Sequence, residues 1–381
     1  MTISKTTLPF AALLAGASLG IAQAQAADEH LPGSMIWSAY DVGSSGYVEA
    51  SAVADALMRK HDVRIRIMPS GTSIGRLLPL RTGRVNYGWL ANEVYFATEA
   101  IYEFASQEWG PQDLRVLLGR PAGFGIAVAG DAGVEEIADL RGKRVARVQA
   151  NPSVNIKVEA IMALAGLTWD DVEVVDLPSY AASLRGQVEG TVDAAGTIPT
   201  AATLRELEAS GRGLVWPSLP PGEDEASWER LREVAPIFEP MEETIGAGLT
   251  EENSAIMIAY RYPMITVYAD ASEEEAYAVT KAVVETFDLY RDVNPAMPRW
   301  DAELSGRPPV DAPFHEGAIR YLEEIGVWTE EDDAWNEVRL ERLQAVMAAW
   351  DEAMNEALEQ QIPGAEWEAF WMEYRESNLA D

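Results

Sequence analysis

The sequence predicts an α/β protein of two lobes, each a sheet flanked by helices, followed by an amphipathic helical extension. Short apolar runs alternate with helical patterns along residues 35–125, and the same alternation begins again along residues 126–215. Strands separated by helices favour parallel sheets with crossover helices. The length of 381 residues is enough for two such units on the usual domain-size scale.

The first unit starts from a clear strand signal. The alternating run RIRIM begins at Arg64 and ends in a Pro-Ser-Gly-Thr-Ser turn, which is typical of a strand that leads into a helix. The patterns predict strands over 64–70, 85–91 and 114–119, and helices over 74–82 and 92–104.

The second unit repeats this organisation. Its patterns predict strands over 125–133, 138–148, 172–177 and 191–198, and helices over 155–165, 181–189 and 200–210. A loop rich in proline, glycine and acid follows over 217–227, and we expect it to be exposed. A strand over 265–270 and a helix over 273–293 indicate a return into the first lobe. Residues 35–125 and 240–328 are therefore assigned to lobe 1, and residues 126–239 to lobe 2.

The last segment, residues 329–381, is strongly acidic and carries apolar residues at helical spacing. The apolar positions are Leu343, Val346, Met347, Trp350, Met354 and Leu358. This pattern predicts an amphipathic helix with a solvated acidic face. The helix either packs on its own domain or docks a partner or a second copy, and the aromatic run EWEAFWMEY keeps the second option open.

The first 26 residues have the layout of a secretory signal peptide. Lys5 precedes an apolar run over 8–22, and the small residues of AQAQA favour cleavage near Ala26. The run is shorter than the roughly 20 apolar residues that cross a bilayer. We therefore expect an exported, periplasmic protein that does not span the membrane after cleavage.

Composition excludes several classes of function. The formal net charge of −33 would repel phosphates, which argues against nucleic acid and anionic lipid as partners. No cysteine is present, so disulfides, thiolate metal sites and cysteine nucleophiles are excluded. The three histidines, His30, His61 and His315, share no metal-ligand or catalytic spacing. The sequence thus predicts a binding protein, not an enzyme, with no metal and no cofactor.

The turn Gly43-Ser44-Ser45-Gly46 precedes an amphipathic helical pattern. It lacks the Gly-Lys-Ser/Thr of a phosphate loop and the Gly-x-Ser-x-Gly of a nucleophile elbow. Hydroxyls and free N–H groups at a helix start can hold an anion or a carbonyl group. The alternative is that a serine simply caps the helix.

Similar turns recur at the ends of other predicted strands. They are Ser70-Gly71-Thr72-Ser73, Asn92-Glu93, the segment 149–153 and the segment 197–200. Because ligands bind at the carboxyl ends of strands in α/β sheets, these turns predict a cleft between the lobes lined by neutral hydrogen-bond donors.

From about residue 35 to residue 328, these motifs together resemble the TAXI-type solute-binding proteins of tripartite ATP-independent periplasmic (TRAP) transporters. The turn 43–47 is similar to the family's Gly-Gly-Thr-Tyr-Tyr, and PSGTSIGRLLPLRTGRVN to its PTGGS segment. DLRGKRV, IPTAA and HEGAIRYLEEIGVW are similar to further family motifs in the same order. The family's Gly-Ser-Gly-Thr is replaced by Asn151-Pro152-Ser153-Val154, which removes N–H donors.

The resemblance implies a two-lobed, type II-like periplasmic binding protein that closes on a small solute and delivers it to a TRAP membrane permease. It implies an organic acid ligand, such as a dicarboxylate, glutamate or 2-oxoglutarate, or an amino acid. A ligand-sensing partner of a membrane signalling receptor, without transport, is an alternative on the same fold. An enzyme built on the two-lobed scaffold is a third.

By position, the resemblance assigns a ligand pocket to residues from both lobes. They are Ser44, Ser45, Tyr47, Ser70, Thr72, Ser73, Asn92 and Tyr95 from lobe 1, and Gln149, Asn151, Ser153, Asn155, Thr197 and Thr200 from lobe 2. Arg147 stands near the same strand end, where it either pairs with a ligand carboxylate or is a surface arginine.

Overall fold

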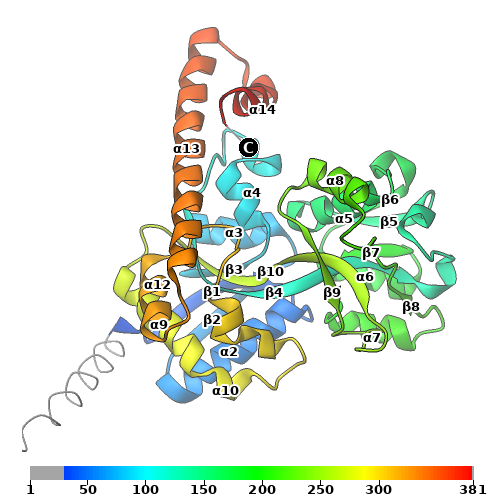
Figure 1. Cartoon of the computed structure of the whole chain (residues 1–381), viewed down its shortest axis with the longest axis horizontal. Helices are drawn as coiled ribbons and strands as arrows, with labels where there is room; N and C mark the ends of the chain where they lie inside the picture. Colours follow the sequence, from blue (N-terminus) through cyan, green and yellow to red (C-terminus); the bar gives the residue numbers. More distant parts are fainter. Residues whose placement is uncertain (1–29, 380–381) are drawn as a thin grey trace, which may run out of the picture.

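The computed structural model describes residues 30–379, and the predicted signal peptide lies outside this range. The chain forms two α/β lobes joined by two long strands, and a helical extension rises from the first lobe (Figure 1). The predicted fold class is confirmed. Within residues 30–379, no helix is both long enough and apolar enough to cross a membrane.

Lobe 1 is built on three parallel strands in the order β2-β1-β3, and a helix follows each strand. The strands are β1 (Ser34–Tyr40), β2 (Arg64–Ser70) and β3 (Tyr87–Leu90), and the helices are α2 (Ser45–His61), α3 (Ser73–Arg81) and α4 (Glu93–Glu99). Later segments complete the lobe: α9 (Glu273–Glu285), α10 (Phe287–Tyr290), α11 (Ala302–Ser305) and α12 (Glu316–Glu324). Trp37 and Trp89 are fully buried at its centre.

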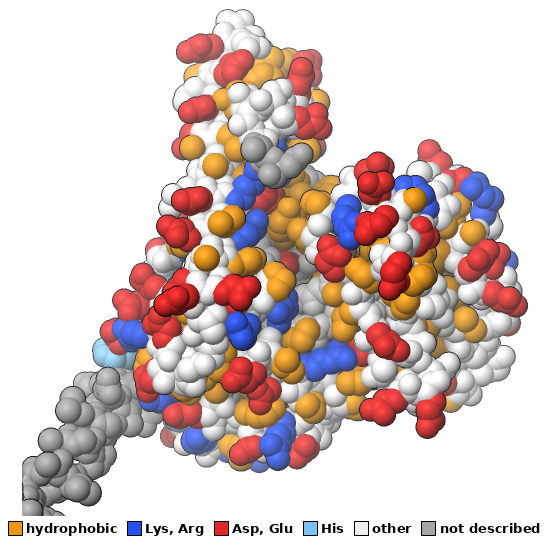
Figure 2. All heavy atoms as spheres, viewed as in Figure 1, with side chains coloured by type: hydrophobic (Ala, Val, Ile, Leu, Met, Phe, Trp, Pro, Cys, Tyr) orange, Lys and Arg blue, Asp and Glu red, His pale blue; other side chains and the backbone are white. Residues whose placement is uncertain are grey.

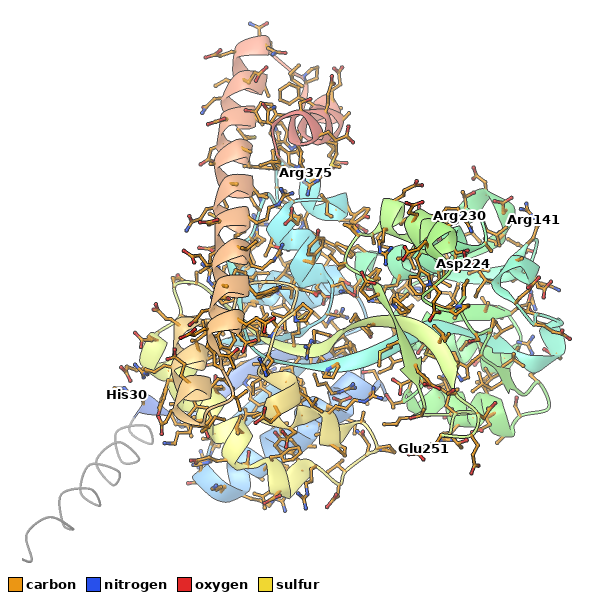
Figure 3. The ribbon with its side chains drawn as sticks, in the orientation of Figure 1. His30, Arg141, Asp224, Arg230, Glu251 and Arg375 are labelled. Carbon is orange, nitrogen blue, oxygen red and sulfur yellow. The ribbon has the colours of Figure 1, made fainter. Side chains whose placement is uncertain are left out.

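Lobe 2 repeats the parallel arrangement with β5 between β6 and β7. The strands are β5 (Arg144–Val148), β6 (Glu173–Leu177), β7 (Ala194–Thr197) and the short β8 (Leu214–Val215), and the helices are α5 (Pro152–Leu164), α6 (Tyr180–Glu189), α7 (Ala202–Ala209) and α8 (Glu225–Val234). The sequence patterns missed α8. Arg230 of α8 donates to the last carbonyls of α5 and ties the two helices together (Figure 3).

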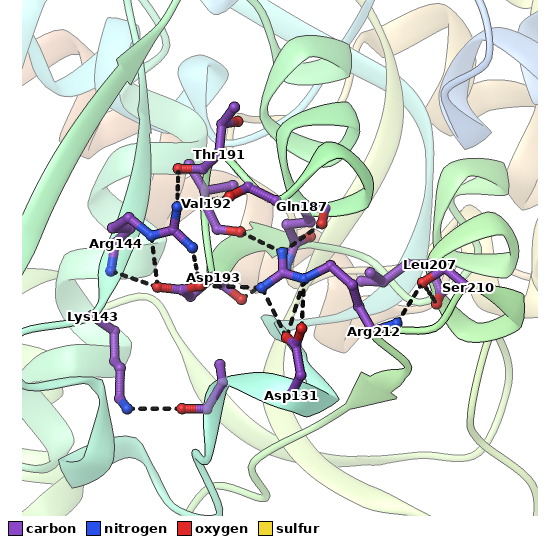
Figure 4. A network of polar contacts seen from close by, with 12 residues as sticks. Asp131, Lys143, Arg144, Gln187, Thr191, Val192, Asp193, Leu207, Ser210 and Arg212 are labelled. Atoms are coloured by element: carbon purple, nitrogen blue, oxygen red, sulfur yellow. Dashed lines mark hydrogen bonds and ion pairs between the residues drawn. The ribbon is translucent and has the colours of Figure 1, made fainter.

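A network of charges stabilises lobe 2 away from the lobe interface. Arg144 contacts the carboxylate of Asp193 at 2.6 Å, and Arg212 joins Asp193 to Asp131 (Figure 4). The network lies at the amino ends of β5 and β7. Because ligands of α/β sheets bind at the carboxyl ends, its role is to fix the sheet.

The lobes are joined by β4 (Leu114–Ala129) and β10 (Ala255–Tyr268), which the sequence patterns predicted only in pieces. The strands predicted over 114–119 and 125–133 belong to one strand, because the pairing with β10 resumes at Pro121 after an irregularity. This strand ends at Ala129, and residues 130–132 form a 3₁₀ segment. β4 pairs antiparallel with β10 along most of its length and with β7 near its end, so both sheets share it. The register of β10 against β4 shifts between Arg261 and Met264, opposite Gly119 and Pro121. The proposed lobe boundary at residues 125/126 falls within β4.

Two predicted helices are shorter than expected. α4 ends at Glu99, because Ala100 adopts a left-handed conformation, and the 3₁₀ segment Tyr102–Ala105 follows. The helix predicted over 273–293 breaks at Thr286 into α9 and α10. β9 (Glu239–Glu243), which pairs with β10, was also missed.

The extension consists of α13 (Glu330–Gln360) and α14 (Trp367–Asn378), which folds back beside it (Figure 1). Of the predicted apolar stripe, Leu343, Val346 and Trp350 are buried, whereas Leu358 is 79% exposed. Leu358 is exposed because the end of α13 projects beyond the surface of lobe 1 (Figure 1).

Aromatic and charged contacts fix the extension to lobe 1. Trp350 packs against Trp367 and Trp371, whose indole N–H groups donate to the carbonyls of Ala105 and Ala100. The buried carboxylate of Glu99, in α4, also accepts from three arginines, and Arg375 reaches it from α14 (Figure 3). The other two arginines are Arg339 and Arg342 of α13. Packing on its own domain, one of the two predicted roles, is therefore observed.

Candidate functional site

Six strand-to-helix turns meet at the boundary between the lobes. Those after β1, β2 and β3 belong to lobe 1, and those after β5, β6 and β7 belong to lobe 2. Five of them were predicted; the sixth, after β6, contains Ser179, which caps α6, and Tyr180. This turn has the same pattern as the one after β2, with Pro-Ser between a strand and a helix. The pattern could therefore have predicted the sixth turn from the sequence.

Direct hydrogen bonds hold the lobes together at these turns. The Ser73 hydroxyl donates to the Asn151 side-chain oxygen at 2.6 Å, and the Asn151 amide nitrogen donates to the carbonyl of Gly71 at 3.3 Å. The Thr200 hydroxyl donates to the Ser45 hydroxyl at 3.0 Å. The backbone N–H of Tyr180 also donates to Gly71. The lobes are therefore in contact, and the arrangement is a closed one.

A narrow cavity lies between the closed lobes. In this closed arrangement the cavity has room for about one water molecule. It is lined by Tyr40, Arg76, Ala91, Phe124, Asn151, Ser153, Val154, Lys157, Tyr180, Ile198, Tyr260 and Tyr262. Both lobes and both crossover strands contribute to this set.

Aromatic rings form much of the cavity wall. The rings of Tyr40 and Tyr262 are 4.7 Å apart between centroids, and those of Tyr260 and Tyr262 are 5.6 Å apart. Burial raises the pKa of Tyr40, Tyr260 and Tyr262, so these hydroxyls keep their protons at neutral pH. The Tyr40 hydroxyl is buried and has no hydrogen-bond partner in the described structure.

The two cations of the cavity lining differ in their partners. Arg76 forms a buried ion pair with Glu93 at 2.8 Å and covers the ring of Tyr40 at 4.2 Å. Its charge is therefore compensated within the protein. None of the described residues that line the cavity is an acid.

Lys157, one helical turn into α5, is only 1% exposed. Its ammonium donates to the Asn92 side-chain oxygen at 2.7 Å and to the Ser153 hydroxyl at 3.0 Å. It also lies 4.3 Å from the centroid of the Tyr260 ring. No carboxylate of residues 30–379 forms an ion pair with it within 4.0 Å. Burial lowers the pKa of Lys157 to about 7.

Asn92 separates Lys157 from a second cavity. Its amide nitrogen donates to the buried carboxylate of Asp311 at 2.8 Å, and burial raises the pKa of Asp311 to about 6. Asp311 lines this second cavity, together with Tyr95 and residues of α13. The charges that act on Lys157 from a distance are those of Glu93, Asp311 and Arg76.

The structure brings part of the predicted pocket to the interface. Asn151 and Ser153 line the cavity. Ser45, Ser73, Asn92 and Thr200 make contacts between the lobes, and the Thr197 hydroxyl hydrogen-bonds to that of Tyr180. Ser45, Ser73, Asn92, Asn151 and Thr200 join the lobes, whereas the bonds of Ser153 and Thr197 lie within lobe 2.

Other predicted residues serve their own segments. Ser44 and Thr72 cap α2 and α3, which was the alternative reading of such turns. The Ser70 hydroxyl bonds within its turn, and the Asn155 side chain bonds the backbone of Val148. Gln149 is exposed, Tyr47 is half-buried, and Tyr95 lines the second cavity.

Arg147 lies outside the cavity. It forms a bidentate ion pair with Asp176 on the neighbouring strand β6, at 2.8 and 2.9 Å. Both side chains are more than 40% exposed. Successive side chains on a strand point to opposite faces, and this one points to the solvent side, so the surface alternative applies.

Arg76, Lys157 and the tyrosines were not predicted. Arg76 follows Ser73 by three residues, and Lys157 follows Ser153 by four. Each basic residue therefore lies one helical turn beyond the serine, on the same face of the helix. That spacing was a usable signal. The tyrosines of β10 gave none, because an alternating strand does not reveal which face meets a ligand.

Among residues 30–379, no group of three or more histidine, aspartate and glutamate side chains is arranged to hold a metal ion. The arrangement can bind an anionic group at Lys157 and pack an apolar body against the rings.

Comparisons with known proteins give a family and a distant structural likeness. A profile of the NMT1-like family matches residues 42–326. The alkanesulfonate-binding protein SsuA from Xanthomonas axonopodis pv. citri, bound to MOPS, is 17% identical, with a TM-score of 0.45 over 77% of this chain and 84% of that one. The amino acid ABC transporter substrate-binding protein AbpA from Streptococcus pneumoniae, bound to L-arginine, is 12% identical, with a TM-score of 0.40 over 70% and 95%. A search among curated proteins found no match.

Proposed function

The chain belongs to the NMT1-like family, and from that membership and the closed interlobe cavity we propose that it is a periplasmic solute-binding receptor. It captures a small organic acid or amino acid between its lobes. A binding protein without catalytic activity agrees with the family.

One observation carries the proposal: Lys157 is a buried cation at the cavity wall without a carboxylate partner. Burying an unpaired charge is costly, and proteins normally pair or neutralise it. A ligand carboxylate in the cavity would supply the missing partner. Burial of Lys157 without a carboxylate partner also lowers its pKa.

Closure follows from the position of the cavity. Lobe 1, lobe 2 and the crossover strands all contribute lining residues, so a ligand contacts the full set only when the lobes meet. A ligand shifts the equilibrium between open and closed forms by its preference for the closed one. The long strands β4 and β10 are the connections about which the lobes would move.

The partner that we propose is a TRAP-type membrane permease. This part of the proposal depends on the resemblance of the chain to TAXI-type receptors in the sequence of its motifs. Its test is uptake of the bound acid into vesicles that contain TRAP-type permease subunits and an imposed ion gradient. Uptake should require this chain, and equal uptake without it would remove the permease from the proposal.

The receptor itself is tested by binding. A calorimetric screen of organic acids and amino acids on the purified chain should find a ligand, and Lys157→Met should weaken its binding. Arg147→Met is the matched control, since it removes a cation from the same lobe outside the cavity. Equal loss of affinity in both variants, or in neither, would contradict the site.

A further inference from the structure

The cavity lining contains one basic side chain without a direct ion pair. Arg76 and Lys157 both line it, but the guanidinium of Arg76 is paired with Glu93, and both side chains of that pair are almost fully buried. Releasing Arg76 to a ligand would leave Glu93 as an unpaired buried charge, which is strongly unfavourable. Lys157 alone is free to meet a ligand anion.

The nearest other acid does not fill this role. Asp311 is held on the far side of Asn92, whose oxygen faces Lys157 and whose nitrogen faces Asp311. Asp311 belongs to the second cavity, whereas Lys157 belongs to the first. A carboxylate bound at Lys157 would therefore not displace an existing ion pair.

The rest of the wall offers no second cation without an ion pair. Apart from Arg76, which is paired with Glu93, the other lining side chains are apolar or neutral polar groups. A second carboxylate placed there would lose its hydration without gaining a cation.

One further group needs a ligand oxygen. The hydroxyl of Tyr40 is buried in the cavity lining and has no acceptor within the described residues. Buried polar groups are almost always hydrogen-bonded in native proteins. A carboxylate or another ligand oxygen would satisfy this donor in addition to Lys157.

We infer that the ligand is a small monocarboxylate, bound through Lys157, and not a dicarboxylate. This rests on the proposed receptor function and specifies its ligand class. It departs from the dicarboxylates and glutamate that the family resemblance implies.

The test is a calorimetric panel on the full mature chain. Monocarboxylates and dicarboxylates of two to ten carbons are compared in matched pairs, including benzoate with terephthalate and butanoate with succinate, together with glutamate, 2-oxoglutarate and the neutral amide benzamide. The tightest ligand should be a monocarboxylate that binds at least tenfold more tightly than its dicarboxylate partner. An aromatic monocarboxylate should also bind at least tenfold more tightly than its amide.

Two variants separate the possible failures. Lys157→Gln should bring the affinities of acid and amide to within about threefold, whereas Arg147→Gln should preserve the difference. A dicarboxylate or glutamate as the tightest ligand, with affinity lost in Lys157→Gln, would overturn the monocarboxylate and leave the receptor standing. Binding of no acid in the panel would overturn both.

Discussion

Gly71 lies where the lobes come closest, and replacing it tests closure directly. A Cβ atom at this position would lie 2.5 Å from the Cβ of Ser179 in lobe 2 and 2.8 Å from a carboxylate oxygen of Asp41. The Asp41 carboxylate could swing aside, but it would then release the N–H of Ala181, which it now accepts at 2.9 Å. The Ser179 Cβ is attached directly to the backbone of α6, so only a shift of the lobe can relieve that contact.

Gly71→Ala should therefore destabilise the closed form selectively. Overpacking of a well-fitted contact typically costs about 1–3 kcal/mol. At about 1.4 kcal/mol per tenfold change, this corresponds to roughly 5- to 150-fold weaker ligand binding. The lobes themselves should fold normally, because Gly71 does not have a positive φ and the main clash exists only across the interface.

Calorimetry with the tightest acid from the panel measures the affinity, and stopped-flow fluorescence measures the rates. We expect the loss to lie mainly in faster dissociation, while the melting temperature without ligand stays within about 2 °C of the parent. Gly211→Ala is the control, since a Cβ there would meet no atom within 4 Å. Unchanged affinity in Gly71→Ala would refute the closed arrangement as the binding form.

Three further outcomes follow from the same contacts. Ser73→Ala should weaken ligand binding by about 1–3 kcal/mol, because it leaves the Asn151 oxygen without its donor at the interface. Ser70→Ala is the control: the Ser70 hydroxyl bonds only within its turn, so this variant should bind the ligand normally in the same titration. Ligand affinity should fall by up to tenfold per pH unit above about pH 7, because burial lowers the pKa of Lys157 to about 7 and the anion binds its protonated form. Titrations at pH 8 in buffers of different ionisation enthalpy should show proton uptake on binding. Constant affinity between pH 6.5 and 9 would contradict this prediction. Glu99→Gln should lower the free energy of unfolding by about 3 kcal/mol, because three arginines lose their shared counter-charge, and should leave ligand affinity unchanged. Urea denaturation measures the stability, and calorimetry measures the affinity. Unchanged stability would contradict the role assigned to Glu99.

The local features of this chain could be predicted because local chemistry determines them. Ser44, Thr72 and Ser179 cap helices with their own hydroxyls, and small polar residues mark the ends of strands wherever they occur. The parallel pairing of β1 with β2 and β3, and of β5 with β6 and β7, follows from helices that separate the strands. Even so, β4 was divided in two, because a proline inside a strand resembles a boundary until its antiparallel partner is known.

The sequence by itself determined the α/β class, the repeated unit, the acidic helical extension and the turns that meet at the boundary between the lobes. Only the tertiary structure decided which side chains face the cavity. Arg76 is compensated by Glu93, 17 residues away, whereas the ammonium of Lys157 donates hydrogen bonds to neutral oxygens, those of Asn92, 65 residues away, and Ser153. Whether a buried cation is paired or left for a ligand depends on groups that folding brings to within 3 Å, and the order of residues along the chain does not contain that distance.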